Sequence, residues 1–205
     1  MIYPTERLII FSDNTKVKYN FLLSTISLDL LLKQVRKVKK PSIKKKLQYS
    51  TIHLVGVGIK EKLPTDLLDK LWIYFPESKF SFFRATILSN FSNLMAPKNH
   101  WSILTETSSS PYESLTSKNV RQKVLQNLIQ LKYVTDAKKI RSIWLHKLVR
   151  GYPIPTIHRD QYVSEFRAFL EQYKIYTRGR FGLWKYEISN QDHTFMQGVE
   201  WVNNI

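Results

Sequence analysis

The sequence predicts an α+β fold in which an antiparallel sheet is flanked by helices. Two observations indicate this class. Short runs of β-branched and aromatic residues occupy positions 50–108, and the connections between them, about ten residues long, are too short for helical crossovers. Helical periodicity then dominates the chain after residue 116. With 43% hydrophobic residues among 205, the chain can bury a core of one large domain.

The N-terminal residues predict a strand, a turn, a second strand and a short helix. Positions 8–11 are apolar, positions 12–15 have the polar composition of a turn, and an extended apolar pattern resumes over 17–26. Apolar residues at helical spacing follow over 28–35, and Ser27 and Asp29 lie where that helix begins.

The predicted sheet contains four strands, at positions 51–59, 70–75, 82–91 and 101–107. The first contains Gly56-Val57-Gly58, which invites a dinucleotide-loop interpretation. That loop needs a third glycine and an immediate helix, whereas position 61 is Glu and Pro64 follows. We therefore interpret Gly56 and Gly58 as residues of a sheet strand and not of a dinucleotide-binding loop.

Three amphipathic helices are predicted, at positions 117–133, 160–173 and 192–202. Asp160 is a candidate N-cap of the second. Positions 143–157, between the first two helices, contain Gly151, Pro153 and Pro155 and predict an irregular segment.

The net charge of +16 favours anionic partners. Eight of the fourteen residues at 33–46 are basic, which suits either a phosphate-binding arm or a solvated helix face. No nucleic-acid motif accompanies the run and Pro41 interrupts it, so the solvated face is the favoured interpretation and nucleic acid an alternative.

Other classes of site are excluded by composition. The chain has no cysteine, and its five histidines are scattered without a metal-binding spacing. Its apolar runs are shorter than the roughly 18–20 residues that span a bilayer, and positions 8–11 are too short for a signal-peptide core. We expect no metal, no membrane and a cytoplasmic location.

Several residues depart from the regular patterns in ways that suit a ligand. Arg84 lies in an apolar strand, where a guanidinium needs a carboxylate or a ligand phosphate, and the sequence leaves both open. Trp72 and Tyr74 share one strand face because side chains alternate. Tyr152 lies between Gly151 and Pro153, where a rigid connector is favoured over a presented side chain.

The segment 178–193 combines arginines, glycines, aromatics, amides and an Asp-His pair, a mixture that suits a phosphorylated ligand with a sugar or flat ring. It ends where the last helix begins, and a helix N-terminus accepts an anionic or carbonyl edge. Asn190 and Asp192 could instead be simple helix caps.

Together and in this order, these blocks resemble the C-terminal half of the eukaryotic-type UDP-galactopyranose mutases, within the amine-oxidase-like flavoproteins. The matching blocks cover almost the whole chain: FSDN (11–14), LLSTISLD (22–29), WIYFPE (72–77), FFRATILSNFS (82–92), WSILTE (101–106), RGYPIPT (150–156) and GRFGLWKYEISNQDHTFMQGVE (179–200). The resemblance implies FAD-domain strands, a helix and a basic linker over 1–49, an antiparallel-sheet substrate domain with helices over 50–175, and a flavin-edge loop with the C-terminal helix over 176–205. The parts outside the substrate domain would belong to an FAD-binding, Rossmann-like domain.

The resemblance also implies roles for individual residues. Residues that would contact the nucleotide sugar are Arg84, on the diphosphate, with Trp72, Tyr74, Tyr152, Tyr186 and Asn190. Residues that would lie beside the flavin are Arg180, Gly182, Gln191, Asp192 and His193.

The chemistry implied is the interconversion of UDP-galactopyranose and UDP-galactofuranose by FAD that NADH or NADPH has reduced. In the family, the flavin N5 attacks the anomeric carbon, displaces UDP and forms a covalent flavin–sugar adduct. No side chain of this chain is therefore expected to act as a catalytic nucleophile or base.

The family's GxGxxG strand–loop–helix is absent from the sequence. We therefore expect a truncated or split-gene chain that is inactive alone and completed by an N-terminal FAD-binding partner chain. The alternatives are a non-catalytic basic module that binds nucleic acid or anionic surfaces, and a fragment of a related FAD-dependent oxidoreductase, against which Arg84 and Tyr152 argue.

Overall fold

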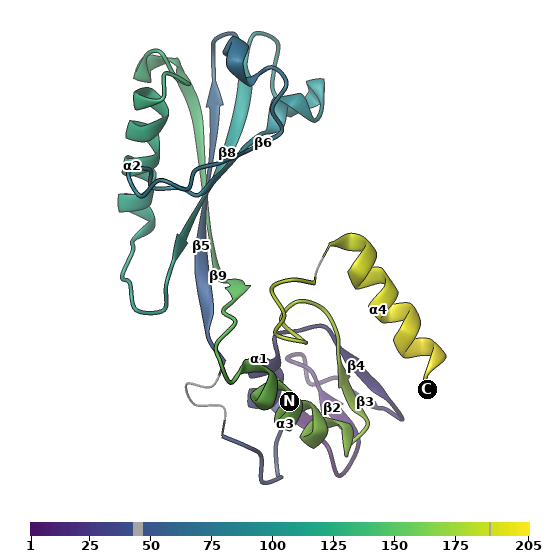
Figure 1. The fold of residues 1–205 in the computed structure, drawn as a ribbon. Helices are drawn as coiled ribbons and strands as arrows, with labels where there is room; N and C mark the ends of the chain where they lie inside the picture. The colour runs from purple at the N-terminus through teal and green to yellow at the C-terminus, as the bar shows by residue number, and fades with distance from the viewer. Residues whose placement is uncertain (43–46, 189) are drawn as a thin grey trace. The chain divides into compact units, whose positions relative to one another are not determined.

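The computed structural model describes residues 1–42, 47–188 and 190–205, arranged in two compact units (Figure 1). The first unit combines Met1–Tyr49 with Tyr152–Ile205, and the second is Ser50–Gly151. Both ends of the chain thus belong to the first unit.

The second unit is built on a five-stranded sheet with the order β6-β7-β8-β5-β9. Its strands are β5 (Tyr49–Ile59), β6 (Trp72–Tyr74), β7 (Arg84–Ile87), β8 (Trp101–Ser109) and β9 (Ile140–Pro153). The pairs β6–β7, β7–β8 and β5–β8 are antiparallel, which confirms the predicted antiparallel sheet. Gly56 and Gly58 lie within β5, opposite Leu104 and Ser102, as the sheet interpretation requires.

Helix α2 (Ser117–Gln130) covers one face of this sheet. Strand residues that alternate along the sequence point to this face because side chains in a strand have a period of two. The resulting core includes Val55, Val57 and Ile103 from the sheet together with Val124 and Leu128 from the helix. The opposite face of the sheet carries Arg84, Glu106 and the two glycines.

Two sequence expectations for the second unit are wrong. The segment expected to be irregular at 143–157 is mostly strand β9, because its glycine and prolines come only at the end of the strand, where proline removes few ladder bonds. The strand expected over 82–91 covers only Arg84–Ile87. Beyond it the chain turns into η2 (Leu88–Asn90), where the Asn90 amide donates hydrogen bonds to the carbonyls of Leu67 and Lys70.

Short 3-10 helices complete the second unit. They are η1 (Thr65–Leu67), η2, η3 (Asn93–Met95) and η4 (Ala137–Lys139). Ser92 and Asp136 cap η3 and η4 with their side-chain oxygens, which satisfies backbone N–H groups at these turns.

The first unit contains small sheets and three helices. The strands are β1 (Ile2–Tyr3), β2 (Leu8–Ile10), β3 (Lys16–Lys18), β4 (Leu22–Ser24) and β10 (Ile175–Thr177). The helices are α1 (Leu28–Gln34), α3 (Arg159–Glu171) and α4 (Gln191–Asn203). Strands β2 and β3 pair antiparallel, with Ile9 opposite Val17, as the predicted strand–turn–strand requires. The extended pattern expected over 17–26 is not one strand, however, because it divides into β3 and β4, which belong to different sheets. Strand β4 pairs in parallel with β10, which joins the two separate parts of the sequence.

Helix α3 belongs to the first unit. The domain boundaries predicted from the sequence had placed it with the sheet, in a domain over 50–175. Its apolar residues Phe166 and Leu170 are fully buried in one cluster with Leu28 and Leu31 of α1. The helix begins at Arg159 after His158, so Asp160 is not its N-cap. The Asp160 carboxylate instead accepts a hydrogen bond from Nε of Arg159 at 2.9 Å.

Candidate functional site

Arg84 lies at the centre of a cross-strand row on the open face of the second unit's sheet. The register places Tyr74 of β6 opposite Arg84, and Glu106 of β8 on its other side. The Nε atom of Arg84 donates to Oε1 of Glu106 at 2.6 Å, and the guanidinium carbon lies 6.0 Å from the centre of the Tyr74 ring. Of the two partners that the sequence left open, the carboxylate is therefore present.

The Arg84–Glu106 pair is accessible mainly through Arg84. The Arg84 side chain is 26% exposed, whereas that of Glu106 is 8% exposed. Glu106 holds the guanidinium of Arg84 in place, and the exposed part of the Arg84 side chain can contact a ligand. Glu106 was not singled out from the sequence. Its signal was the single charged residue in a strand of otherwise uncharged residues, the counterpart of Arg84.

Trp72 and Tyr74 form an exposed aromatic strip beside Arg84. Their side chains are 54% and 63% exposed, and the Trp72 ring meets Phe91 edge-on with 5.6 Å between ring centres. Exposed aromatic rings next to a cation suit a ligand that has both a flat or sugar ring and a phosphate. The structure thus brings together three of the residues predicted to contact a nucleotide sugar.

A second cluster lies within the first unit, where Arg180, Tyr152 and Tyr186 are in contact. The guanidinium carbon of Arg180 lies 5.0 Å from the centre of the Tyr152 ring. The rings of Tyr152 and Tyr186 are 5.3 Å apart between centres. Within the described residues, the buried Nε of Arg180 has no hydrogen-bond acceptor. A buried donor without a partner is costly, which suits an acceptor supplied by a ligand.

Trp184 holds the loop that carries this cluster. It is fully buried, its indole N–H donates to the carbonyl of Gln48 at 3.0 Å, and its ring meets Phe181 edge-on at 5.3 Å. Position 182 requires glycine for steric reasons, because a Cβ there would overlap the carbonyl oxygen of Arg178 and lie 2.9 Å from the carbonyl carbon. The close approach at Gly182 is therefore to the chain's own backbone, and contact with a flavin stays a prediction.

The loop leads into the N-terminus of α4. Asn190 is its N-cap and makes no side-chain cap bond, and Asp192 lies inside the first turn, so neither is a capping side chain. The backbone N–H groups at 191–193 are those that an α-helix leaves without an intrahelical acceptor. Asn190, Gln191, Asp192 and His193 are all exposed. Gln197, also unnoticed in the sequence, anchors the helix by accepting a hydrogen bond from the Gly179 N–H at 2.7 Å.

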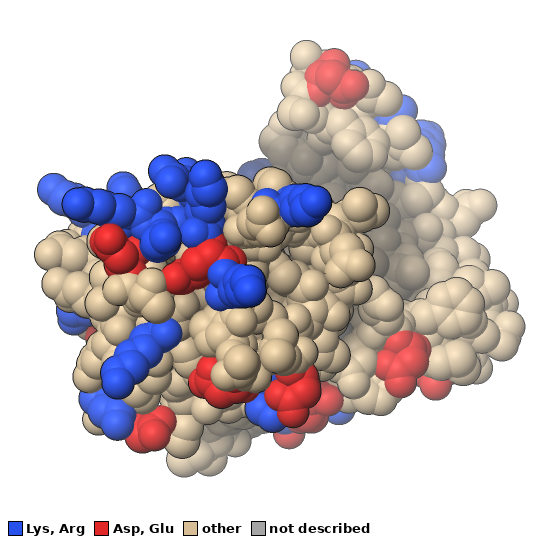
Figure 2. Space-filling view, turned by 90° about the horizontal axis from the view of Figure 1, so that it is seen from above, with Lys and Arg blue, Asp and Glu red and all other residues tan. Residues whose placement is uncertain are grey.

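The basic run is largely tied to α1. Lys40 donates to the carbonyls of Leu32 and Val35 near the helix C-terminus, where positive charge is favourable. Lys33 pairs with Asp29, and Lys37 with Glu6. Residues 43–46, which complete the run, lie outside the described residues. On the face drawn in Figure 2, Lys and Arg side chains gather toward one side with acidic side chains between them.

Two further kinds of site can be assessed over residues 1–42, 47–188 and 190–205. Nowhere in these ranges do three or more His, Asp or Glu residues gather as metal ligands. None of the helices in the same ranges has the length and apolar composition needed to cross a membrane.

Comparison with solved structures finds one protein that matches nearly the whole of this chain. A crystal structure of reduced UDP-galactopyranose mutase matches 98% of this chain with a TM-score of 0.92 and 34% sequence identity, and the chain spans 44% of that protein's length. A fatty acid isomerase from P. acnes matches over 100% of this chain and 46% of its own, with a TM-score of 0.72 and 14% identity. A protein from Exiguobacterium named for protoporphyrinogen oxidase matches over 93% and 43%, with a TM-score of 0.64 and 17% identity. The last two share the fold alone.

A scan against family models finds no match. The matched region covers 98% of this chain, with 34% of its residues identical, and so spans the segments from which the resemblance was inferred. The resemblance to the UDP-galactopyranose mutase family is therefore confirmed, for a chain that spans less than half of the mutase it matches.

Proposed function

We propose that this chain forms the sheet side and the flavin-edge segment of a UDP-galactopyranose mutase, which interconverts UDP-galactopyranose and UDP-galactofuranose with FAD as cofactor. The observation that carries the proposal is the mutase match over 98% of the chain at a TM-score of 0.92. The two clusters of predicted site residues, each formed within its own unit, support it.

In this proposal the sheet cluster binds the nucleotide sugar. The guanidinium of Arg84 binds the diphosphate, and Glu106 orients the guanidinium by accepting its 2.6 Å hydrogen bond. Trp72 and Tyr74 line the sugar and nucleotide. Positive charge beside the diphosphate stabilises UDP as it leaves the anomeric carbon, so Arg84 would act mainly on the transition state.

The C-terminal cluster would hold the flavin edge. The Arg180 guanidinium, whose buried Nε has no acceptor among the described residues, fits a flavin carbonyl or ring nitrogen. The N–H groups of Gln191, Asp192 and His193 would approach the ring from the start of α4, with Gly182 in the loop that leads there. Tyr152, Tyr186 and Asn190 would orient the sugar and diphosphate. The reduced flavin supplies the nucleophile, and NADH or NADPH supplies its electrons.

The 205 residues contain no GxGxxG loop for the ADP part of FAD. We infer that this part is bound by other polypeptide, either a separate partner chain or a continuation of this one, and that the reaction takes place in the cytoplasm. Alone, the 205 residues are expected to bind FAD weakly and to show no turnover.

Equilibrium dialysis with FAD tests the need for the other polypeptide. We expect the 205-residue chain to bind FAD weakly. After an N-terminal FAD-binding half is added, we expect tight binding of FAD and turnover. Stoichiometric tight binding by the 205 residues alone would show that no further polypeptide is required.

The assignment of Arg84 to the diphosphate is tested in the reconstituted enzyme with Arg84→Lys. This variant keeps the positive charge but loses the planar guanidinium that can donate two parallel hydrogen bonds. Losing a charge-assisted hydrogen bond of about 1.5–3 kcal/mol lowers kcat/KM for UDP-galactofuranose about 10–100-fold. Arg121→Lys, on α2, is the matched control and should leave kcat/KM unchanged. Equal kcat/KM values for Arg84→Lys and the unmodified enzyme would remove Arg84 from the site.

A further inference from the structure

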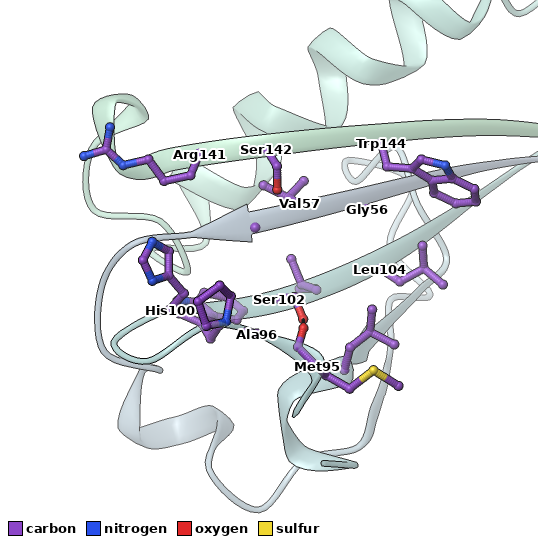
Figure 3. A pocket seen from close by; sticks show the side chains of 15 residues that line it. Gly56, Val57, Met95, Ala96, His100, Ser102, Leu104, Arg141, Ser142 and Trp144 are labelled. Atoms are coloured by element: carbon purple, nitrogen blue, oxygen red, sulfur yellow. Dashed lines mark hydrogen bonds between the residues drawn. The ribbon is translucent and has the colours of Figure 1, made fainter. Parts of the chain in front are cut away.

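A hollow of about 500 Å³ lies on the open face of the second unit's sheet (Figure 3). Leu104 of β8 and Trp144 of β9 line it from the sheet, and Leu88, Met95 and Pro97 line it from the segment 88–97, which includes η2 and η3. Figure 3 shows Met95, Leu104 and Trp144 toward the same end of the hollow. None of the described residues that line it is acidic. The hollow is therefore suited to apolar side chains.

Side chains of β9 cover the two glycines of β5. A Cβ at Gly58 would overlap Oγ of Ser142, and a Cβ at Gly56 would lie 3.6 Å from two carbon atoms of Trp144. The indole of Trp144 therefore lies beside Gly56 on the open face. Leu145, the next residue of β9, points to the other face because side chains alternate along a strand. Trp144 thus gives the hollow an apolar wall.

Apolar side chains extend from this hollow toward the cluster around Arg84. Leu104 and Glu106 lie on the same face of β8, and their backbones are about 7 Å apart because a strand rises about 3.4 Å per residue. Phe91 follows η2 and contacts Trp72 with 5.6 Å between ring centres. The side chains of this apolar strip are Phe91, Leu94, Met95, Leu104 and Trp144, of which Leu94 is 94% exposed.

The composition of the apolar strip is typical of a protein interface. Aromatic residues and Met are enriched at the buried centres of interfaces, where they fill pockets of the partner. Phe91, Met95 and Trp144 are each about half exposed, although they are large and apolar. A continuous exposed apolar surface of this kind marks an interaction site.

The segment that carries Leu94 and Met95 is fixed to the sheet. The Ser102 hydroxyl donates to the Met95 carbonyl at 3.0 Å, and the Ser102 N–H donates to Oγ of Ser89 at 2.8 Å. Ser92 caps η3 by accepting a hydrogen bond from the Leu94 N–H. Hydrogen bonds thus hold Leu94 and Met95 in exposed positions, so little ordering is needed when a partner binds.

The polypeptide that holds the ADP part of FAD is the partner that fits this face. This chain spans 44% of the length of the mutase it matches, so more than half of that protein's length lies outside it. In the proposed function, on which this choice of partner rests, the sugar bound beside Arg84 reacts with the flavin. The polypeptide that carries the flavin must therefore approach the open face of the sheet, where the apolar strip begins about 7 Å from Glu106.

A second copy of this chain is a less suitable partner for the apolar strip. Each chain has a net charge of +16, and like charges of this size repel when two copies approach. Burial of the strip between two copies would have to offset that repulsion, which is strongest at low salt. A different polypeptide is under no such constraint.

We propose that the apolar strip is the docking surface for the FAD-binding polypeptide of the mutase. An apolar segment of that polypeptide fills the hollow between Met95 and Trp144, beside the nucleotide-sugar site at Arg84. Docking there buries apolar side chains, while the diphosphate is bound separately by Arg84.

Titration calorimetry of the 205-residue chain with a separately expressed N-terminal FAD-binding half tests the proposal. Met95→Ser and Trp144→Ser should each weaken association about tenfold or more, because each removes a large apolar side chain from the interface. Both side chains are about half exposed in the chain, so the variants should fold, and urea midpoints check this. Leu145→Ser is the matched control, because it changes an exposed apolar residue on the other face of the same strand, and it should leave association unchanged.

Two results would overturn the proposal. One is the absence of association, or association of Met95→Ser and Trp144→Ser as tight as that of the unmodified chain. The other is a dimer of the 205-residue chain, seen by sedimentation velocity, that Trp144→Ser dissociates, because a second copy would then occupy the apolar strip.

Arg84→Lys separates the docking surface from the proposed function. In the complex it should lower kcat/KM for UDP-galactofuranose but leave the association of the two polypeptides unchanged. A complex that depends on Met95 and Trp144 yet has no mutase activity contradicts the proposed function and supports the docking surface. Turnover with undiminished association of Trp144→Ser supports the proposed function and overturns the docking surface.

Discussion

At the scale of single residues, the most informative side chains are polar or charged groups in apolar or buried surroundings. The charge of Arg84 in an apolar strand is balanced by Glu106, whereas the buried Nε of Arg180 has no hydrogen-bond acceptor among the described residues. His53 is a third case. It is only 1% exposed, its Nε2 lacks a partner among the described residues, and burial together with the charge of Lys147 lowers its pKa.

The depressed pKa of His53 predicts a pH-dependent stability. In the unfolded chain an imidazole binds a proton below its ordinary pKa of about 6.5, whereas in the folded protein it stays neutral to lower pH. Stability is therefore complete above that value and decreases as pH falls below it, by at most about 1.4 kcal/mol per pH unit. Urea unfolding at pH 7.5, 6.5 and 5.5 should show this loss in the unmodified protein and a smaller one in His53→Gln. His146→Gln, at an exposed position of β9, is the control, and identical slopes for all three proteins would contradict the assignment.

Gly182 offers a second prediction at this scale. Its missing side chain makes room for the Arg178 carbonyl, so Gly182→Ala should destabilise the protein by about 1–3 kcal/mol even without cofactor. Gly198→Ala is the matched control, since a Cβ there meets nothing within 4 Å and alanine favours the helix by about 0.5–1 kcal/mol. Urea denaturation measures both, and a Gly182→Ala variant as stable as the parent would show that this backbone contact can relax.

At the scale of elements, the attachment of α4 depends on few contacts. Among the described residues of α4, Gln197 is buried, and the ring of Trp201 contacts that of Tyr176 at 5.9 Å between centres. A helix with so little buried apolar surface is held largely by the hydrogen bond between Gln197 and the Gly179 N–H. Because this bond also fixes the loop of Arg180, it couples the start of α4 to the proposed flavin edge.

Gln197→Ala removes that acceptor and leaves the Gly179 N–H unsatisfied. We expect a loss of about 1–3 kcal/mol of local stability, seen as faster amide hydrogen exchange in α4 and in the loop at 178–185, with little change in the second unit. Gln191→Ala, which deletes the same side chain at an exposed position of the same helix, should leave exchange unchanged. Equal protection in the two variants would mean that other contacts hold the helix.

At the scale of the whole molecule, the described residues form two hydrophobic cores that share no member. The core of the second unit forms within one continuous stretch, Ser50–Gly151, whereas that of the first combines both ends of the chain. The predicted site residues divide accordingly, with Arg84, Trp72 and Tyr74 in the second unit and the remainder in the first.

The features that could be predicted from the sequence alone are local. Alternation and helical spacing predicted β5, β8 and the three amphipathic helices, because a buried face imposes its period on neighbouring residues. The sequence blocks around Arg84 and Arg180 indicated the family through their resemblance to it. The tertiary structure was needed to show that β9 runs to Pro153, that α3 packs on α1, that Glu106 holds Arg84 and that β10 pairs with β4. Each of these is a choice of partner between segments distant in sequence, and that choice depends on which surfaces bury one another in three dimensions, which no local pattern encodes.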